Sequence, residues 1–230
     1  MPFPLMIFAA GFGTRMGALT ATRPKPLIAV AGKPLLDHAL DLATDAHAAP
    51  IAVNTHYLAG QIADHLRGRP VAISEEREQI LETGGGLRRA LPLLGQGPVM
   101  TLNSDAVWTG TNPLTQLAKA WDAARMDALL LLLPAEDALG HRGTGDFLLA
   151  SDGRIARANG QPGLVYLGAQ ILKPDGLSNI GAPVFSLNLL WNEMIEAGRA
   201  YGIVHQGGWC DVGRPEGITE AEQLLAASHV

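Results

Sequence analysis

The chain is poor in three features that mark common classes of protein: cysteine, clustered positive charge and long apolar runs. Its 230 residues include a single cysteine, Cys210, which excludes an intrachain disulfide and fits a reducing compartment. The net charge is −5 and no basic cluster is present, which argues against a nucleic-acid or anionic-membrane partner. The longest apolar run, 128–135, is about half of the ~20 residues that a membrane-spanning helix needs. These absences predict a cytoplasmic protein whose partners are neither nucleic acid nor a membrane.

Short apolar segments alternate with segments of helical period in the first half of the chain. The expected strands are 5–9, 51–54, 71–74 and 99–102. Apolar residues at three- and four-residue steps predict one buried helix face, made of Leu35, Leu36, Ala39, Leu40, Leu42 and Ala43. This alternation predicts βαβ units around a mostly parallel sheet. The strand carboxyl ends then open toward one edge, where ligands bind.

From residue 128 onward, strand-like runs are separated by Gly and Asp turns, which indicates antiparallel pairs. The expected strands are 129–133, 147–150, 154–158 and 165–171. Helices are expected at 188–199 and, starting at Pro215, at 215–227. No repeat, low-complexity tract or linker divides the chain, and 47% hydrophobic content suits a single core. We expect one α/β domain.

A glycine-rich turn directly follows the first expected strand. Gly11 and Gly13 permit positive φ and leave no Cβ in the way of a ligand, so backbone amides can turn toward phosphate oxygens. Arg15 and Lys25 then supply positive charge, and the prolines on either side of Lys25 predict an extended segment that aims it across a cleft. The turn predicts a nucleoside-triphosphate site; a plain strand-to-helix connection is the alternative.

The spacing of this turn excludes two other phosphate loops. A dinucleotide fingerprint needs a third glycine where Met16 stands, and the next glycine, Gly17, comes one residue late. A P-loop needs Gly-Lys-Ser or Gly-Lys-Thr after four intervening residues, and neither occurs here.

The same stretch resembles the signature of the sugar-1-phosphate nucleotidyltransferases, Gly-x-Gly-Thr-Arg-Leu-x-Pro-Leu-Thr followed by Pro-Lys-Pro-Leu. The match covers 11–27, with Ala18 where the family usually has proline, and it continues at 30–35, 82–86, 102–105 and 209–213. It implies a Rossmann-like three-layer sandwich with a mostly parallel central sheet and a smaller antiparallel acceptor-side region. In one domain, 1–230, residues 1–125 would be mainly the nucleotide-binding half and 126–230 mainly the sugar-binding half.

The resemblance also implies the chemistry: nucleotidyl transfer from an NTP to a sugar 1-phosphate, with release of pyrophosphate. Arg15, Lys25 and Asp105 would be catalytic, and Asp105 and Asp211 would hold Mg²⁺. Either aspartate alone is more often a turn or a helix cap. The nucleotide-binding residues implied are Ala10, Gly11, Gly13, Thr14, Arg15, Lys25, Glu82, Thr83, Gly84 and Asn103. The sugar-binding residues implied are Gly145, Tyr166 and Gly168, for which hairpin turns are an equally good explanation.

The segment 82–86 stands where the family's base-recognition loop lies, and it also fits a flexible helix N-terminus capped by Thr83. With Glu82 in place of the usual glycine, and in so short a chain, this form is similar to the N-acetylmuramic acid 1-phosphate uridylyltransferases of peptidoglycan recycling. Mannose-1-phosphate guanylyltransferases share the frame. A guanylyl- or cytidylyltransferase, or a nucleotide-binding module without turnover, stays open, as does a monomer or a small homo-oligomer.

Some residues are given no role in this interpretation. Four histidines lie nine residues apart, which places them on no common helix face: His38, His47, His56 and His65. Cys210 has no identifiable partner base and is interpreted as a small buried residue.

Overall fold

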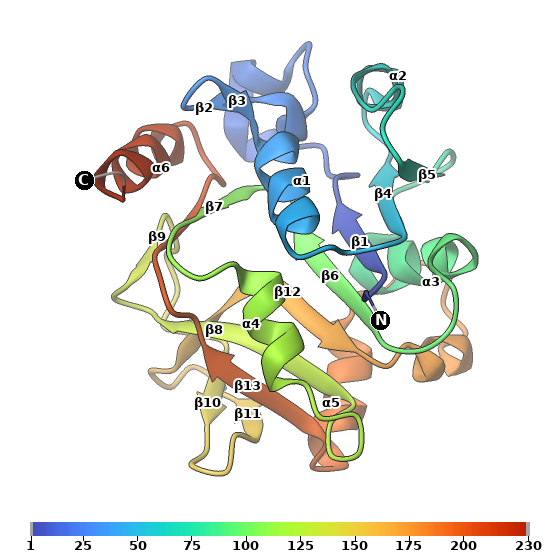
Figure 1. Ribbon diagram of the computed structural model, residues 1–230, viewed down its shortest axis with the longest axis vertical. Coiled ribbons are helices and arrows are strands. Elements are labelled where there is room, and N and C mark those ends of the chain that lie inside the picture. Colours follow the sequence, from blue (N-terminus) through green and yellow to red (C-terminus); the bar gives the residue numbers. More distant parts are fainter. Residues whose placement is uncertain (1, 229–230) are drawn as a thin grey trace.

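A mixed β-sheet runs through the centre of the molecule, whose computed structural model describes residues 2–228 (Figure 1). Its strands in the described part of the chain are β1 (Leu5–Phe8), β4 (Ile51–Thr55), β5 (Val71–Glu75), β6 (Val99–Asn103), β8 (Ala128–Pro134), β10 (Phe147–Leu149), β11 (Ile155–Arg157), β12 (Leu164–Leu172) and β13 (Ala200–Val204). They follow the order β11-β10-β12-β6-β1-β4-β5, and β8 joins β12 to β13. The strands expected from the sequence are all present, and no end differs from the expected one by more than one residue.

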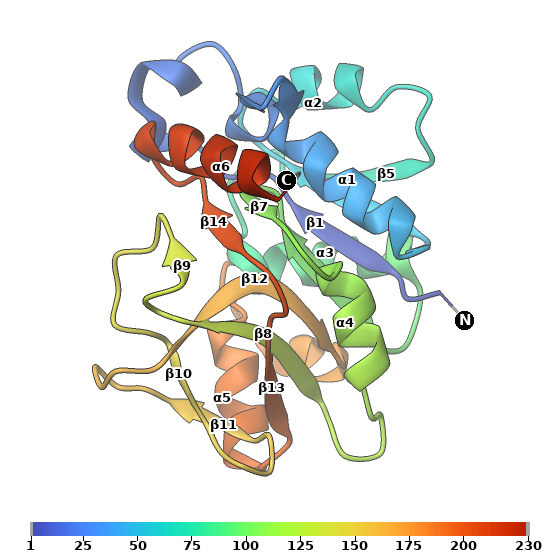
Figure 2. The same cartoon turned by 60° about the vertical axis from the view of Figure 1, so that its left-hand side comes forward.

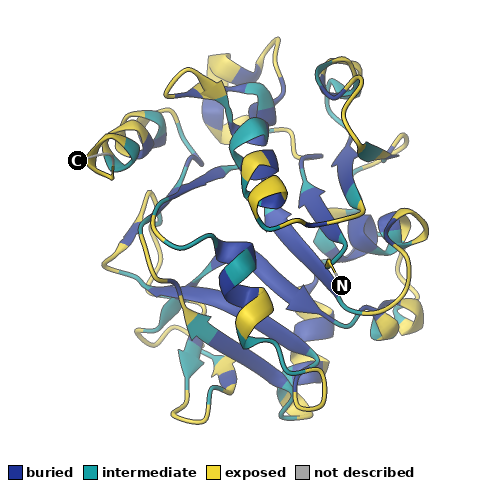
Figure 3. Cartoon of the chain, in the orientation of Figure 1, coloured by how far each residue is buried: buried dark blue, intermediate teal, exposed yellow. Residues whose placement is uncertain are grey.

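Helices cover both faces of this sheet (Figure 1, Figure 2). The described helices are α1 (Leu35–Asp45), α2 (Ala59–His65), α3 (Glu82–Leu94), α4 (Pro113–Ala120), α5 (Asn188–Glu196) and α6 (Glu216–Ala227), of which α6 packs on a smaller sheet instead. Successive strand residues point to opposite faces. Leu5 and Ile7 therefore pack with α1 and α4, whereas Met6 packs with α3 and α5. The sheet is thus buried on both sides, as Figure 3 shows, which gives the expected three layers.

The order of the parallel strands locates a crevice. β1 pairs in parallel with both β4 and β6, and β4 pairs in parallel with β5. The chain runs from β1 to β4 and β5 on one side, and then returns to β6 on the other side. Such a reversal leaves an open crevice at the carboxyl ends of the two strands that flank it. Here those ends are Phe8 and Asn103, which are paired in register.

The second half adds antiparallel strands, as the turns predict. β12 pairs antiparallel with β6, β8 and β10, and β10 with β11. The helix expected over 188–199 ends earlier, at Glu196, because Gly198 adopts a positive φ of 67° and the chain turns into β13. β13 then pairs in parallel with β8, a strand that the sequence analysis did not anticipate.

Short elements complete the fold. They are β2 (Ala29–Val30), β3 (Lys33–Pro34), β7 (Ala106–Trp108), β9 (Ala138–Leu139), β14 (Trp209–Asp211) and the 3-10 helices η1 (Thr14–Thr20), η2 (Lys25–Leu27) and η3 (Asp175–Asn179). β7, β14 and β9 form a small sheet, against which α6 packs (Figure 2). This sheet joins segments from both halves of the chain beside the crevice. Across residues 2–228, no helix has the length and apolar character needed to cross a membrane.

Candidate active site

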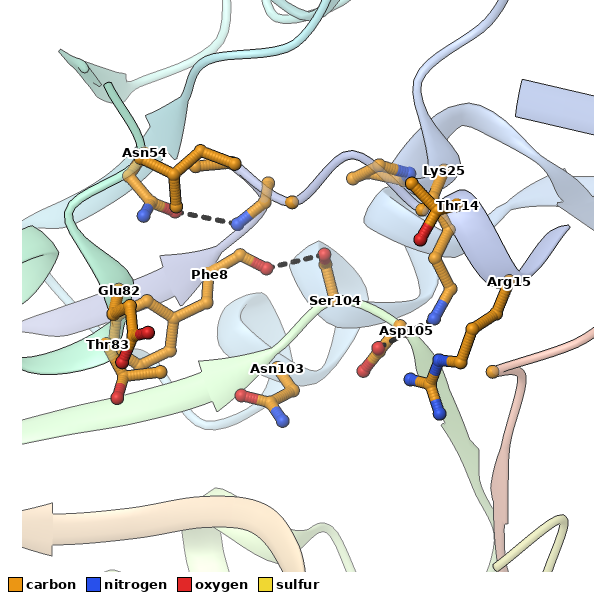
Figure 4. Close-up of a pocket in the computed structure, with 17 residues that line it drawn as sticks. Phe8, Thr14, Arg15, Lys25, Asn54, Glu82, Thr83, Asn103, Ser104 and Asp105 are labelled. Carbon is orange, nitrogen blue, oxygen red and sulfur yellow. Dashed lines mark hydrogen bonds and ion pairs between the residues drawn. The ribbon is translucent and has the colours of Figure 1, made fainter. Parts of the chain in front are cut away.

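A cavity of about 330 Å³ lies at the carboxyl ends of β1 and β6 (Figure 4). It is lined by Phe8, Ala9, Ala10, Gly11, Gly13, Thr14, Arg15, Lys25, Pro26, Asn54, Ile80, Glu82, Thr83, Asn103, Ser104, Asp105 and Gly213. Arg15, Lys25 and Asp105 gather at one end, and Glu82 and Thr83 at the other (Figure 4). The glycine turn and the end of β6, 90 residues apart in sequence, thus share one cavity, as the topology requires.

The turn after β1 presents unpaired backbone amides. In the described part of the chain, the N–H groups of residues 10–14 donate no hydrogen bond to the protein. Gly13 adopts a left-handed φ of 65°, and a Cβ added there would lie 2.8 Å from Lys25 Cβ. Gly11 does not use a positive φ, but no other atom lies within 4 Å of where its Cβ would be. The turn therefore has free donors and open space beside them, which suits an anion.

Lys25 lines the cavity and is paired with Asp105. Its side chain is buried against Gly13, with 7% of the residue exposed, and Nζ lies 2.7 Å from Asp105 Oδ2. The expectation of an extended segment is wrong for Lys25 itself: Pro24 is extended, but Lys25 begins η2. Pro26 is accommodated because the first residues of a helix need no N–H donor.

Asp211 lies beside Asp105 because their strands are neighbours. β14 pairs antiparallel with β7, Asp211 stands opposite Ala106, and Val212 N donates to Asp105 O at 2.8 Å. Burial and, next, the Asp105 carboxylate raise the pKa of Asp211, while Lys25 and Arg15 oppose that rise. Asp211 does not line the main cavity; it lines two smaller ones, one of which shares Arg15 with the main cavity.

Asn54 and Glu76 form hydrogen bonds to the backbone on either side of the cavity, at the turn after β1 and at the start of α3. The sequence analysis predicted a role for neither residue. Asn54 Oδ1 accepts from Ala9 N at 2.7 Å, and its Nδ2 donates to Glu76 Oε1 at 2.7 Å. Glu76 also accepts from Leu81 N at 2.7 Å. A sequence signal for Asn54 did exist: it is a polar residue near the carboxyl end of β4, and β4 pairs with β1.

The three glycines of α3 are packed inside the protein. Rather than forming a loop, residues 82–86 are the first turns of α3, and Thr83 is not its cap: its Oγ1 accepts from Leu187 N. A Cβ at Gly84 would lie 2.4 Å from the Phe185 ring. Gly84 N and Gly85 N both donate to Phe185 O. Because Gly84 has no side chain, Phe185 can pack directly against the helix. Gly84 does not line the cavity.

The family model for the MobA-like NTP transferase domain matches residues 5–162. The N-acetylmuramate alpha-1-phosphate uridylyltransferase of Caulobacter vibrioides is 42% identical, and the match covers 96% of each chain. The enzyme of the same name from Neisseria meningitidis is 36% identical over 96% of this chain and 98% of that enzyme. This chain belongs to the sugar-1-phosphate nucleotidyltransferases. The resemblance noted in the sequence is therefore confirmed.

Solved structures of nucleotidyltransferases share this fold. A putative glucose-1-phosphate thymidylyltransferase from Bacillus anthracis has a TM-score of 0.81 at 15% identity, covering 96% of this chain and 94% of that one. HddC from Yersinia pseudotuberculosis, in complex with GMP-PN, has a TM-score of 0.78 at 21% identity, covering 96% and 98%. The predicted nucleotide-diphospho-sugar transferase fold is confirmed.

The sugar-side residues expected in this nucleotidyltransferase are spread out. Gly168, with a φ of 82°, lies against Asn103: a Cβ there would be 2.6 Å from Asn103 Nδ2. Tyr166 packs edge-to-face on Trp191, with ring centroids 4.9 Å apart, and burial raises the pKa of its hydroxyl. Gly145 lies against Gly163, 2.4 Å from where its Cβ would be, and does not line the cavity. Of the three, Gly168 borders the cavity through its contact with Asn103.

Proposed function

We propose that this protein transfers the uridylyl group of UTP to N-acetylmuramate 1-phosphate, forming UDP-N-acetylmuramate and pyrophosphate. An oxygen of the acceptor phosphate forms a bond to the α-phosphorus, and the bond from that phosphorus to its bridging oxygen breaks. The electron pair leaves with pyrophosphate, so no covalent enzyme intermediate is needed. The two full-length uridylyltransferase relatives support this choice. The observation that carries it is the cavity in which Arg15, Lys25 and Asp105 meet.

Charge is the main requirement of this reaction, because two phosphorylated anions must approach one another. The free amides of residues 10–14 and Arg15 suit the β- and γ-phosphates. Lys25, held by Asp105 at 2.7 Å, suits a position between the α-phosphate and the attacking phosphate. Transition-state charge is best stabilised by groups already fixed in place, and the burial of Lys25 fixes it.

The donor set fits Mg²⁺, the cofactor that we propose. Mg²⁺ is usually held by one or two carboxylates together with substrate phosphates and water. Asp105 and Asp211 offer two adjacent carboxylates, whose mutual repulsion a divalent cation relieves. When bound, the ion supplies charge neutralisation at the reacting phosphates.

The two ends of the cavity suit the two parts of the nucleotide. With the phosphates beside Arg15 and Lys25, the base would lie toward Glu82 and Thr83, at the end away from those cations (Figure 4). Asn103 lies between, opposite Gly168 of the second half of the chain, where the acceptor sugar would enter. A reaction that consumes an NTP suits a cytoplasmic enzyme, and the product suits peptidoglycan recycling.

A matrix of substrates tests this function. The full chain is incubated with Mg²⁺, each of the four NTPs and each of several sugar 1-phosphates, and pyrophosphate release is measured. We expect the fastest release with UTP and N-acetylmuramate 1-phosphate. Release with GTP and mannose 1-phosphate, but none with the first pair, would overturn the proposal in favour of a guanylyltransferase. That alternative has support in the mannose-1-phosphate guanylyltransferase catalytic subunit beta of Danio rerio, 27% identical over 92% of this chain and 61% of that protein.

A further inference from the structure

A second, smaller cavity adjoins the phosphate end of the site. It has a volume of about 190 Å³ and is lined by Arg15, Gly140, His141, Arg142, Gly143, Asp211 and Arg214. We call it the arginine lobe. Arg15 lines both this lobe and the main cavity, so a ligand can extend from one into the other. Three of the lining residues are arginines, which gives the lobe a strongly positive character.

Within residues 2–228, no ion pair involves the arginines of the lobe. Across the described residues, the side chains of Arg15, Arg142 and Arg214 form neither an ion pair nor a hydrogen bond. By contrast, Lys25 is paired with Asp105. Asp211 is the acidic side chain of the lobe. Arg142 and Arg214 also line a neighbouring cavity, which includes Glu216 and Glu220. Unpaired guanidinium groups that line one cavity suit an anionic ligand with several oxygens.

The backbone brings the segments that carry Arg142 and Arg214 next to Asp211. β9 pairs in parallel with β14, so the chain after β9 runs past Asp211. Gly140, with a φ of 76°, presses against that strand: a Cβ there would lie 2.3 Å from Asp211 O. Arg214 follows Asp211 by three residues, at the turn before α6. In the same lobe, His141 Nε2 is buried and has no hydrogen-bond partner in the described chain.

In the proposed binding mode, the arginine lobe lies next to Arg15, after the α-phosphate in the direction from the base to the γ-phosphate. A nucleotide with its base near Glu82 and its α-phosphate near Lys25 would carry its remaining phosphates past Arg15. When the bond to the α-phosphorus breaks, the electron pair stays on the diphosphate, so negative charge grows there. We propose that Arg142 and Arg214, together with Arg15, bind the β- and γ-phosphates of the NTP and the pyrophosphate that leaves. This inference rests on the proposed nucleotidyl transfer and gives the second half of the chain a part in the nucleotide site.

Binding of magnesium pyrophosphate to the full chain, followed by calorimetry, tests the lobe without turnover. Arg142→Ala and Arg214→Ala are each expected to weaken that binding about tenfold, since a hydrogen bond to a charged group contributes at least that factor. The double variant should lose more. The matched control is Arg67→Ala, an exposed arginine of the α2 region paired with Asp64. Arg142→Lys and Arg214→Lys, which retain the charge, should recover part of the affinity.

Steady-state kinetics supply the second measurement. The variants should raise the KM for the NTP about tenfold and leave the KM for the sugar 1-phosphate within about twofold. Unchanged pyrophosphate affinity in a folded double variant, or a rise in the acceptor KM in place of the NTP KM, would overturn the inference. A parent protein that binds pyrophosphate through the lobe but turns over no NTP would instead count against the proposed function.

Discussion

The amide of Asn54 connects the start of the glycine-rich turn after β1 to the buried carboxylate of Glu76. It accepts from Ala9 N at 2.7 Å and donates to Glu76 Oε1 at 2.7 Å. Glu76 is 1% exposed and also accepts from Leu81 N, at the start of α3. One chain of hydrogen bonds thus joins the phosphate end of the cavity to its opposite end.

Replacing Asn54 with alanine should destabilise both the turn after β1 and the start of α3. Ala9 N loses its acceptor and Glu76 loses a donor, so we expect about 2 kcal/mol less stability, the usual cost of a buried unpaired polar group. The KM for the NTP should rise. Urea unfolding and initial-rate kinetics measure the two effects, with the exposed Asn179→Ala as control. Unchanged stability and NTP KM would show that the connection is incidental.

Lys25→Met should reduce kcat by about 10²–10³, the loss typical when one preorganised charged donor is removed. The side chain is nearly isosteric, so the packing against Gly13 is retained while the charge at Asp105 is lost. Pre-steady-state rates and the unfolding midpoint separate chemistry from folding. Lys33→Met, which removes an exposed lysine paired with Asp41, is the control. A kcat within a few-fold of the parent refutes the catalytic role of Lys25.

Gly168→Ala should weaken binding of the acceptor sugar 1-phosphate more than binding of the nucleotide. The new Cβ would lie 2.6 Å from Asn103 Nδ2 and displace that side chain in the cavity. Gly160→Ala is a close control, because Gly160 has nearly the same φ, 84°, but nothing within 4 Å of its Cβ position. The KM for the sugar 1-phosphate should rise at least tenfold only in the Gly168 variant. Equal effects of the two variants would indicate backbone strain alone.

Asp127 should make stability depend on pH in the acidic range. The Arg199 guanidinium, followed by Lys173, holds the pKa of this carboxyl below its ordinary value of 3.8, against some desolvation. A depressed pKa stabilises the fold above the unfolded value, and that contribution is lost as pH falls through the folded value. Asp127→Asn should therefore be less stable than the parent at pH 7, with the difference shrinking below about pH 4. A difference that does not vary with pH, measured by urea unfolding, would contradict this assignment.

Cys210 should resist thiol reagents in the folded protein. The residue is fully buried in β14, and burial, with smaller effects of Glu220 and Asp211, raises the pKa of its thiol to about 12. Because the thiolate is the reactive form, labelling at pH 8 should require unfolding. A chromogenic disulfide reagent should report slow reaction in buffer and one fast equivalent in urea. Rapid labelling of the native protein would mean that β14 opens readily.

Local patterns predicted the parts of the fold that depend on nearby residues. The apolar run of β1 and the helical period of α1 are both readable because neighbouring residues decide them. The phosphate turn belongs to the same class, since Gly13, Arg15 and Lys25 lie within 13 residues. β7 and β14 escaped notice because they are short and pair with one another across about 100 residues, whereas the equally short β10 and β11 flank one local turn.

The remaining features of the fold and the site depend on contacts between segments that are far apart in the sequence. The glycines of α3 looked suited to a planar base, yet the close neighbour of Gly84 is Phe185, which no pattern near residue 84 reveals. Likewise, Asn54 and Glu76 gain their roles only when β4 and the segment after β5 lie together beneath β1. Arg142 and Arg214 are about 70 residues apart in the sequence, and they line the same cavity because β9 pairs with β14.

The pairing of β7 with β14 also sets when the site can first exist during synthesis. Asp105 is synthesised about 106 residues before Asp211, the residue of β14 that lies beside it in the fold. A nascent chain that has folded its parallel strands therefore has the phosphate turn and Lys25 but only one of the two carboxylates. Chains released before residue 211 would expose the edge of β7 and lack one of the two carboxylates proposed to bind Mg²⁺, so premature termination should yield inactive products that proteases can recognise.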